Sequence, residues 1–365
     1  MAYCSERISA RIKVSSFLAM LSVFVLHWSG ASIYTKSQGL LAFDRVLRAA
    51  AEWAVPYFFV VSGFFFDRAL SVESFNGVRF LRKKISSLFV PYLVWGAVWG
   101  GVVTTTLVLL NNAEKGLPML SRTFMEGESY AVDKLLGIMV LHPVNTALWY
   151  VRALLLFFLL TPLWRWLRQR SRVALAVFAV AFIAIFSRVA TFDVVEQVRL
   201  YPRIVFQFKV QSIGWLLLGM SISACQLEDR KISTGFFALL VIILIIQLSQ
   251  VCVGIQNPLL GEIVGRTMPM TIIVVVWGLF QRVDAVIKND VLRSLFDATF
   301  WAYCMHVPVC GWSKAIVRHV FGYTELAYCV DLTIGIATGF LLCWGSAAFV
   351  RRISPRAYSV LSGGR

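Results

Sequence analysis

The run VSSFLAMLSVFVLHWSG, residues 14–30, decides the fold class, and it carries a histidine, His27, near its far end. A helix needs about 20 apolar residues to cross the hydrocarbon core of a bilayer. The apolar block extends to residue 33 and follows Arg7, Arg11 and Lys13. A block of this length behind basic residues predicts a retained signal anchor that spans the membrane.

The composition of the whole chain points to a membrane protein. Of its 365 residues, 59% are hydrophobic and 15% charged, whereas a soluble domain carries about 25% charged residues. We therefore expect an all-α, polytopic membrane helical bundle of about ten transmembrane helices. The ten blocks are 14–33, 53–70, 85–110, 147–164, 173–190, 204–224, 234–253, 267–281, 295–316 and 329–350. A shorter block, 135–144, predicts an interfacial or re-entrant helix.

The charge pattern sets the expected orientation. Lys and Arg are more frequent in the set of alternate loops that includes both ends of the chain, which predicts cytoplasmic termini. The expected organisation is a cytoplasmic tail at 1–13, a membrane domain at 14–350 and a second cytoplasmic tail at 351–365. The net charge of +16 then reflects loop cations beside anionic lipid rather than a nucleic-acid site. The seven cysteines have no CxxC spacing and predict no metal site.

Three ionisable side chains fall inside apolar blocks, where a charge is costly to bury and therefore suggests function. They are His27, Arg152 and His306, and all three can lie in the outer half of the bilayer. Each has a structural alternative. His27 can be a neutral packing residue, Arg152 can extend to the headgroups, and His306 can bond a carbonyl freed by Pro308.

Two further stretches carry recognisable patterns. In RFLRKK, Arg79 and Arg82 are three residues apart and share a helix face, which suits a phosphate-bearing ligand. The alternative is ordinary positive charge on the cytoplasmic side. In VPYFFVVSGFFF, the small pair Ser62-Gly63 permits close approach of a neighbouring helix.

In chain order, these stretches resemble the acyltransferase-3 family of integral membrane acyltransferases. The resemblance rests on VFVLHW, VPYFFVVSGFFF, RFLRKKISSLFVPYLVW, ALWYVRALLLFFLLTPL and TFWAYCMHVPV, which cover roughly residues 14–350. It implies a membrane O-acyltransferase in the bacterial cytoplasmic (inner) membrane, with acyl-CoA, acetyl-CoA above all, as donor substrate and no permanently bound cofactor. The acceptor is then a hydroxyl of a surface glycan or lipid-linked saccharide.

The resemblance also assigns roles to residues. It places catalysis at His27, as a general base or a transient acyl carrier, and acyl-CoA contact at Arg79 and Arg82. Arg152 or His306 is the expected stabiliser of the oxyanion. The family's arginine eleven positions before the histidine is Ser16 here, and Lys13 or Arg11 is the cation that can replace it.

Two other functions fit the same composition. A transporter or flippase can use His27 and His306 as a buried proton relay. A structural membrane protein is the third interpretation, and the buried histidines and arginine weigh against it.

Overall fold

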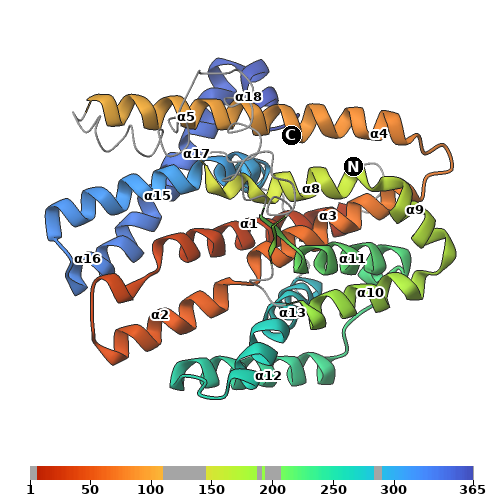
Figure 1. The fold of residues 1–365 in the computed structure, drawn as a ribbon, viewed down its shortest axis with the longest axis horizontal. Helices are drawn as coiled ribbons and strands as arrows, with labels where there is room; N and C mark the ends of the chain where they lie inside the picture. The colour runs from red at the N-terminus through yellow and green to blue at the C-terminus, as the bar shows by residue number, and fades with distance from the viewer. Residues whose placement is uncertain (1–5, 110–144, 187–190, 194–206, 283–289, 365) are drawn as a thin grey trace. The chain divides into compact units, whose positions relative to one another are not determined.

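A computed structural model describes residues 6–109, 145–186, 191–193, 207–282 and 290–364 (Figure 1). These residues are almost entirely helical. The exceptions are two short paired strands, β1 (Thr191–Asp193) and β2 (Gln207–Lys209), and the connecting turns. The predicted all-α membrane architecture is therefore confirmed in outline.

The chain divides into two compact units. The first comprises Met1–Gly77, Leu160–Ala190 and Lys209–Ala347. Its helices are α1 (Glu6–Trp28), η1 (Ala31–Ile33), α2 (Gln38–Ala51), α3 (Ala54–Leu70), α9 (Thr161–Arg170), α10 (Arg172–Ile185), α11 (Gln211–Ala224), η4 (Leu227–Asp229), α12 (Thr234–Val253), α13 (Pro258–Arg282), α14 (Asp290–Asp297), α15 (Thr299–Phe321), α16 (Glu325–Val330), the π-helical turn η5 (Asp331–Gly335) and most of α17 (Ile336–Ile353).

The second unit comprises Val78–Leu159, Thr191–Phe208 and Ala348–Arg365. It contains most of α4 (Gly77–Lys84), the π-helical turn η2 (Ile85–Phe89), α5 (Val90–Leu109), η3 (Thr146–Leu148), α8 (Trp149–Leu159) and α18 (Pro355–Leu361). Trp95 of α5 donates from its indole nitrogen to the Leu361 carbonyl at 3.0 Å, which ties α18 to α5. The rings of Phe80 and Phe158 meet edge to face at 5.6 Å.

Five stretches among the described residues are long and apolar enough to cross a membrane. They are Glu6–Ile33, Gln38–Leu70, Thr234–Val253, Pro258–Arg282 and Glu325–Ile353, and Thr146–Leu159 with Thr161–Arg170 makes a sixth if the two form one broken span. Helix α12 is apolar all round, and only Gln247 among its side chains is buried, as expected of a helix that faces lipid. The count of ten spans and the cytoplasmic termini stay predictions.

Several helix boundaries differ from the predicted blocks. The second block, 53–70, matches α3 to within one residue, but the residues ahead of it form the amphipathic helix α2 rather than a loop. The fourth block is two helices, since the chain breaks at Leu160 and restarts with Pro162 in the first turn of α9. In the described part of the sixth block, from residue 207 on, β2 comes first and α11 starts only at Gln211. The segment 135–144 lies outside the described residues.

The first unit is held together by an unusually close approach of α3 and α11, which lie side by side (Figure 1). A Cβ atom on Gly63 would stand 1.9 Å from the Leu216 carbonyl oxygen, and one on Gly219 would stand 1.9 Å from the Val60 carbonyl oxygen. The two glycines therefore let the backbones touch. This confirms the packing role expected of the Ser62-Gly63 pair.

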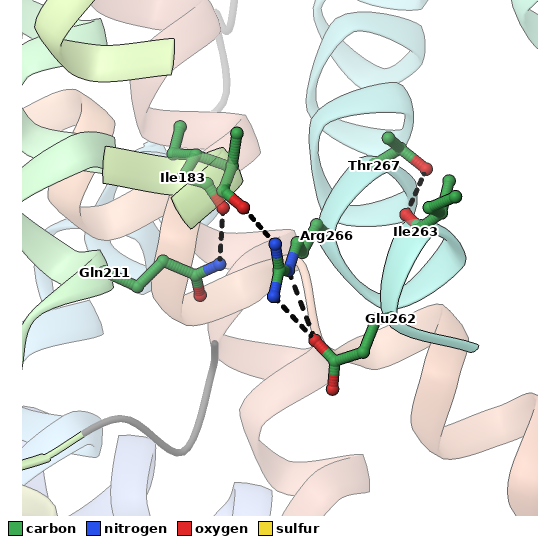
Figure 2. Close-up of polar contacts among 7 residues, drawn as sticks. Ile183, Gln211, Glu262, Ile263, Arg266 and Thr267 are labelled. Atoms are coloured by element: carbon green, nitrogen blue, oxygen red, sulfur yellow. Dashed lines mark hydrogen bonds and ion pairs between the residues drawn. The ribbon is translucent and has the colours of Figure 1, made fainter. Parts of the chain in front are cut away.

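Polar contacts connect α10, α11 and α13 at their facing ends (Figure 2). Gln211 donates from its side-chain nitrogen to the Ile183 carbonyl at 3.3 Å. Arg266 lies between the Glu262 carboxylate, at 3.0 Å, and the Ala184 carbonyl. These bonds satisfy carbonyls at the end of α10 that have no partner within the helix.

Three ion pairs occupy the end of the first unit near the start of α1. Arg168 meets Asp67 at 2.5 Å, Arg68 meets Glu228, and Lys13 meets Asp297 at 2.7 Å. Lys13 is one of the two cations expected to replace the family arginine at Ser16. In the structure its charge is paired with Asp297.

We predict that Gly63→Ala destabilises the protein, because the added methyl group must push α3 away from α11. Overpacking of this kind costs about 1–3 kcal/mol. Thermal unfolding of the purified protein in detergent measures the effect. Gly345→Ala is the matched control, since nothing lies within 4 Å of a Cβ atom at that helical position. Equal unfolding midpoints for the two variants would contradict the close approach.

Candidate active site

The candidate site is built around the last turn of α1, where His27 lies. The next residue, Trp28, is fully buried and stacks on Phe24 at 5.1 Å. A Cβ atom at Gly335 or Gly339 would stand 2.6 Å from the Trp28 ring, so this ring fills the space that the two glycines leave open. The tryptophan thereby fixes the end of α1, while the His27 side chain remains exposed.

His306, on α15, meets His27 from the neighbouring helix. The two ring centroids are 4.7 Å apart and the ring planes cross at 69°. The helices are tied at the same level, because the Cys310 thiol donates to the His27 carbonyl at 3.1 Å. Two of the three predicted catalytic residues therefore lie in direct contact.

The surroundings of His306 define what its two nitrogen atoms do. The side chain is fully buried, and Nδ1 lies 2.7 Å from the Tyr303 carbonyl oxygen. The contact is with a carbonyl of the preceding turn, as in the structural alternative, but the carbonyl that Pro308 leaves without its helical partner is that of Cys304 and not that of Tyr303. The second nitrogen, Nε2, is buried without a hydrogen-bond partner. A buried polar atom without a hydrogen-bond partner is energetically costly, so its presence in a native structure suggests a functional role.

Two buried aspartates near this end of the unit each accept a hydrogen bond from a tyrosine in a different part of the chain. Tyr34 donates to Asp331 at 2.7 Å, and Tyr328 donates to Asp44 at 2.8 Å. Asp44 also accepts from the Gly30 amide at 2.9 Å. These crossed pairs connect the turn after α1, the helix α2 and the end of α16.

Asp331 lies in a stretch of backbone that departs from the α-helix. It opens the π-helical turn η5, and such turns are frequent at functional sites. One of its carboxylate oxygens accepts from Tyr34, while the other is buried without a partner.

Two cations complete the site, and both contact Ser29, two residues after His27. Arg48 Nη1 donates to the Ser29 hydroxyl at 3.2 Å, and Lys314 Nζ donates to the Ser29 carbonyl at 3.2 Å. They come from α2 and α15, so three helices contribute to this end of the unit.

The other predicted site residues belong to the second unit. Arg152 is half-buried on α8 and lies close enough to the buried Tyr92 for an electrostatic interaction. Arg79 and Arg82 are exposed on α4, as the pattern predicted. Beside them, the Lys84 ammonium lies over the rings of Phe80 and Phe158. The roles of Arg152, Arg79 and Arg82 stay predictions.

Sequence reasoning missed six polar members of the site: Tyr34, Asp44, Arg48, Lys314, Tyr328 and Asp331. Asp331 and Lys314 sit inside predicted blocks, so the rule on buried ionisable residues would have found them. Asp44 gave no such signal, because residues 38–51 looked like a loop. Within the described part of the chain, no group of three or more His, Cys, Asp or Glu side chains could hold a metal ion.

Comparison with known proteins places the chain in a family. The family model described as an acyltransferase domain, acyltransferase-3, matches residues 17–348. A relative in Rhizobium meliloti (strain 1021), the succinoglycan biosynthesis protein ExoH, is 24% identical over 369 residues, which cover 98% of this chain and 93% of the relative. No solved structure matches. The match spans nearly all of the membrane region, and the chain belongs to the acyltransferase-3 family.

Proposed function

We propose that this membrane acyltransferase moves an acetyl group from cytoplasmic acetyl-CoA to a hydroxyl of a surface glycan or lipid-linked saccharide, in the bacterial cytoplasmic membrane. The observation that carries the proposal is the contact between His27 and His306 at 4.7 Å. The family supports acyl transfer, and the name of the relative, a succinoglycan biosynthesis protein, supports a glycan acceptor.

The bond of His306 to the Tyr303 carbonyl fixes its chemistry. A carbonyl oxygen can only accept, so Nδ1 carries the hydrogen and a neutral ring has an unshared pair on Nε2. Such a ring has no second N–H to donate to an oxyanion. We therefore assign His306 as an acceptor that orients His27 and stabilises its protonated form, in place of the oxyanion role expected from the sequence.

His27 acts as the general base in this scheme. It takes the proton of the acceptor hydroxyl while that oxygen attacks the thioester carbonyl. The new C–O bond forms, the C–S bond breaks, and the proton passes from His27 to the departing CoA sulfur. The exposed His27 ring is accessible to an acceptor, whereas the buried His306 ring is not. Arg152 remains the candidate donor to the oxyanion.

A covalent route uses the same residues. His27 can first accept the acyl group and then release it to the acceptor hydroxyl. One ring nitrogen of His27 attacks the thioester carbonyl, the C–S bond breaks, and the proton of the other nitrogen passes to the departing CoA sulfur. The acceptor hydroxyl then attacks the acyl group, the C–N bond breaks, and the hydroxyl proton returns to His27. In both routes His306 accepts a hydrogen bond from the protonated His27 ring. Trapping of labelled acyl group on His27 separates the two routes.

The transporter alternative also uses the histidine pair, as a proton relay, and one assay separates the two functions. Membranes that contain the protein are incubated with acyl-labelled acetyl-CoA and with the cell's own glycans. Label in alkali-labile esters of glycan supports acyl transfer. Solute flux without any such label supports transport and contradicts the proposal.

We expect His27→Ala to abolish transfer, because loss of a general base typically lowers the rate by about 10²–10⁴. The measurement is the rate of label transfer in membranes with matched protein levels. His319→Ala is the control, since His319 is an exposed histidine on the same helix as His306. Activity of the His27 variant within threefold of wild type would remove His27 from the mechanism.

We expect Arg79→Lys and Arg82→Lys to raise the apparent KM for acetyl-CoA although charge is kept. An arginine fork makes two parallel bonds to phosphate that a lysine cannot reproduce. Charge-assisted bonds are worth about 1.5–3 kcal/mol, so KM should rise roughly tenfold to a hundredfold. Lys83→Arg is the control on the same helix. An unchanged KM would mean that the pair only orients the chain in the membrane.

A further inference from the structure

The site contains two cations that no carboxylate neutralises by direct contact. Arg48 and Lys314 each donate to Ser29, through its hydroxyl and its carbonyl. In the part of the chain that the structure describes, neither forms an ion pair within 4 Å. Both contact Ser29, two residues from His27; the Arg48 side chain is exposed and the Lys314 side chain is half-buried.

The aspartates of the site form no direct ion pair with these cations, although Asp331 lies close enough to Lys314 for an electrostatic attraction. Tyr328 and the Gly30 amide donate to Asp44, and Tyr34 donates to Asp331. A third cation, Arg318, lies one turn beyond Lys314 and donates to the Lys314 carbonyl at 3.0 Å. A third carboxylate, Glu325, accepts from the Thr35 hydroxyl, so none of these three carboxylates is directly bonded to a cation of the site.

Ordinary cations near the end of a span extend outward to the headgroups. Arg48 and Lys314 instead converge on one buried residue, Ser29, from two different helices. Repulsion between like charges opposes such convergence. An anion placed between the two side chains would remove that repulsion, because a guanidinium offers a fork of donors and an ammonium a point charge.

We propose that Arg48 and Lys314 form a subsite for an anionic group of the acceptor, which places the acceptor hydroxyl beside His27. This inference rests on the proposed function and names the acceptor's chemistry: a saccharide that carries a phosphate or a carboxylate. The anionic group comes either from the diphosphate of a lipid-linked saccharide or from the carboxylate of an acidic sugar.

Anion binding is tested first, on the purified full-length protein in detergent. Arg79→Gln/Arg82→Gln serves as the background, so that the predicted acyl-CoA phosphate site does not contribute. Inorganic diphosphate and glucuronate are the two probes, and the thermal unfolding midpoint is the readout. We expect a probe to raise the midpoint in the background protein, and Arg48→Gln or Lys314→Gln to remove that shift. Lys36→Gln, which removes an exposed cation, is the control and should keep it.

The two probes distinguish the sources of the anion. A shift with diphosphate alone identifies a phosphate-bearing acceptor, and a shift with glucuronate alone identifies an acidic sugar. Shifts with both probes support the subsite, and the larger shift identifies the anion that it prefers. No shift with either probe, or equal shifts in the background and all three added variants, overturns the subsite.

Acyl transfer is measured separately, with Arg79 and Arg82 intact. Arg48→Gln/Lys314→Gln should raise the apparent KM for the glycan acceptor about tenfold or more and leave the KM for acetyl-CoA unchanged. If wild-type membranes transfer no label while the probe shift still depends on Arg48 and Lys314, the proposed function is wrong and the anion site stands. If transfer occurs and the acceptor KM does not change, the subsite is wrong and the proposed function stands.

Discussion

The crossed hydrogen bonds of Tyr34 with Asp331 and of Tyr328 with Asp44 are the constraint on which the site depends. Each bond joins the α1–α2 region to the segment that follows α15. In a poorly solvated environment such bonds are strong. Loss of the Tyr34 bond removes the hydrogen bond that the structure shows to the Asp331 carboxylate, whereas Asp44 keeps its bond from the Gly30 amide. The crossed bonds hold α1 beside α15, where His27 in the last turn of α1 contacts His306 near the start of α15.

Donor binding and acyl transfer are proposed at different parts of the chain. The histidine pair lies at the carboxyl-terminal end of α1. The ion pair of Lys13 with Asp297 lies nearer the amino terminus of the same helix. Acyl transfer is proposed at the histidines, whereas the donor's phosphates are assigned to α4. Both arginines of α4 and the His27 side chain are exposed, whereas the His306 ring is buried and bonded to the Tyr303 carbonyl. In the proposed function acetyl-CoA is cytoplasmic and the acceptor is on the far side of the membrane, so donor binding and acyl transfer are assigned to different residues.

Much of the fold and part of the candidate site could be predicted from the sequence. Long apolar blocks fixed the helical membrane class, and the cost of burying ionisable groups singled out His27 and His306. Their contact could not be predicted, because hydropathy gives the depth of a residue but not the rotation of its helix. The helix α2 was missed for a related reason. Its residues, QGLLAFDRVLRAAA, have an apolar face and a polar face, and averaging over a window cancels the two. Asp44 and Arg48 were hidden with it.

The central claim is that His27 and His306 act as one unit, and a double-mutant cycle tests it most directly. The rate of label transfer from acetyl-CoA to glycan is measured for wild type, His27→Ala, His306→Ala and the double variant. Residues that act as a unit are non-additive. The account predicts that the double variant is no slower than His27→Ala alone, because His306 works only through His27. Rate losses that multiply would show two independent residues and contradict the account.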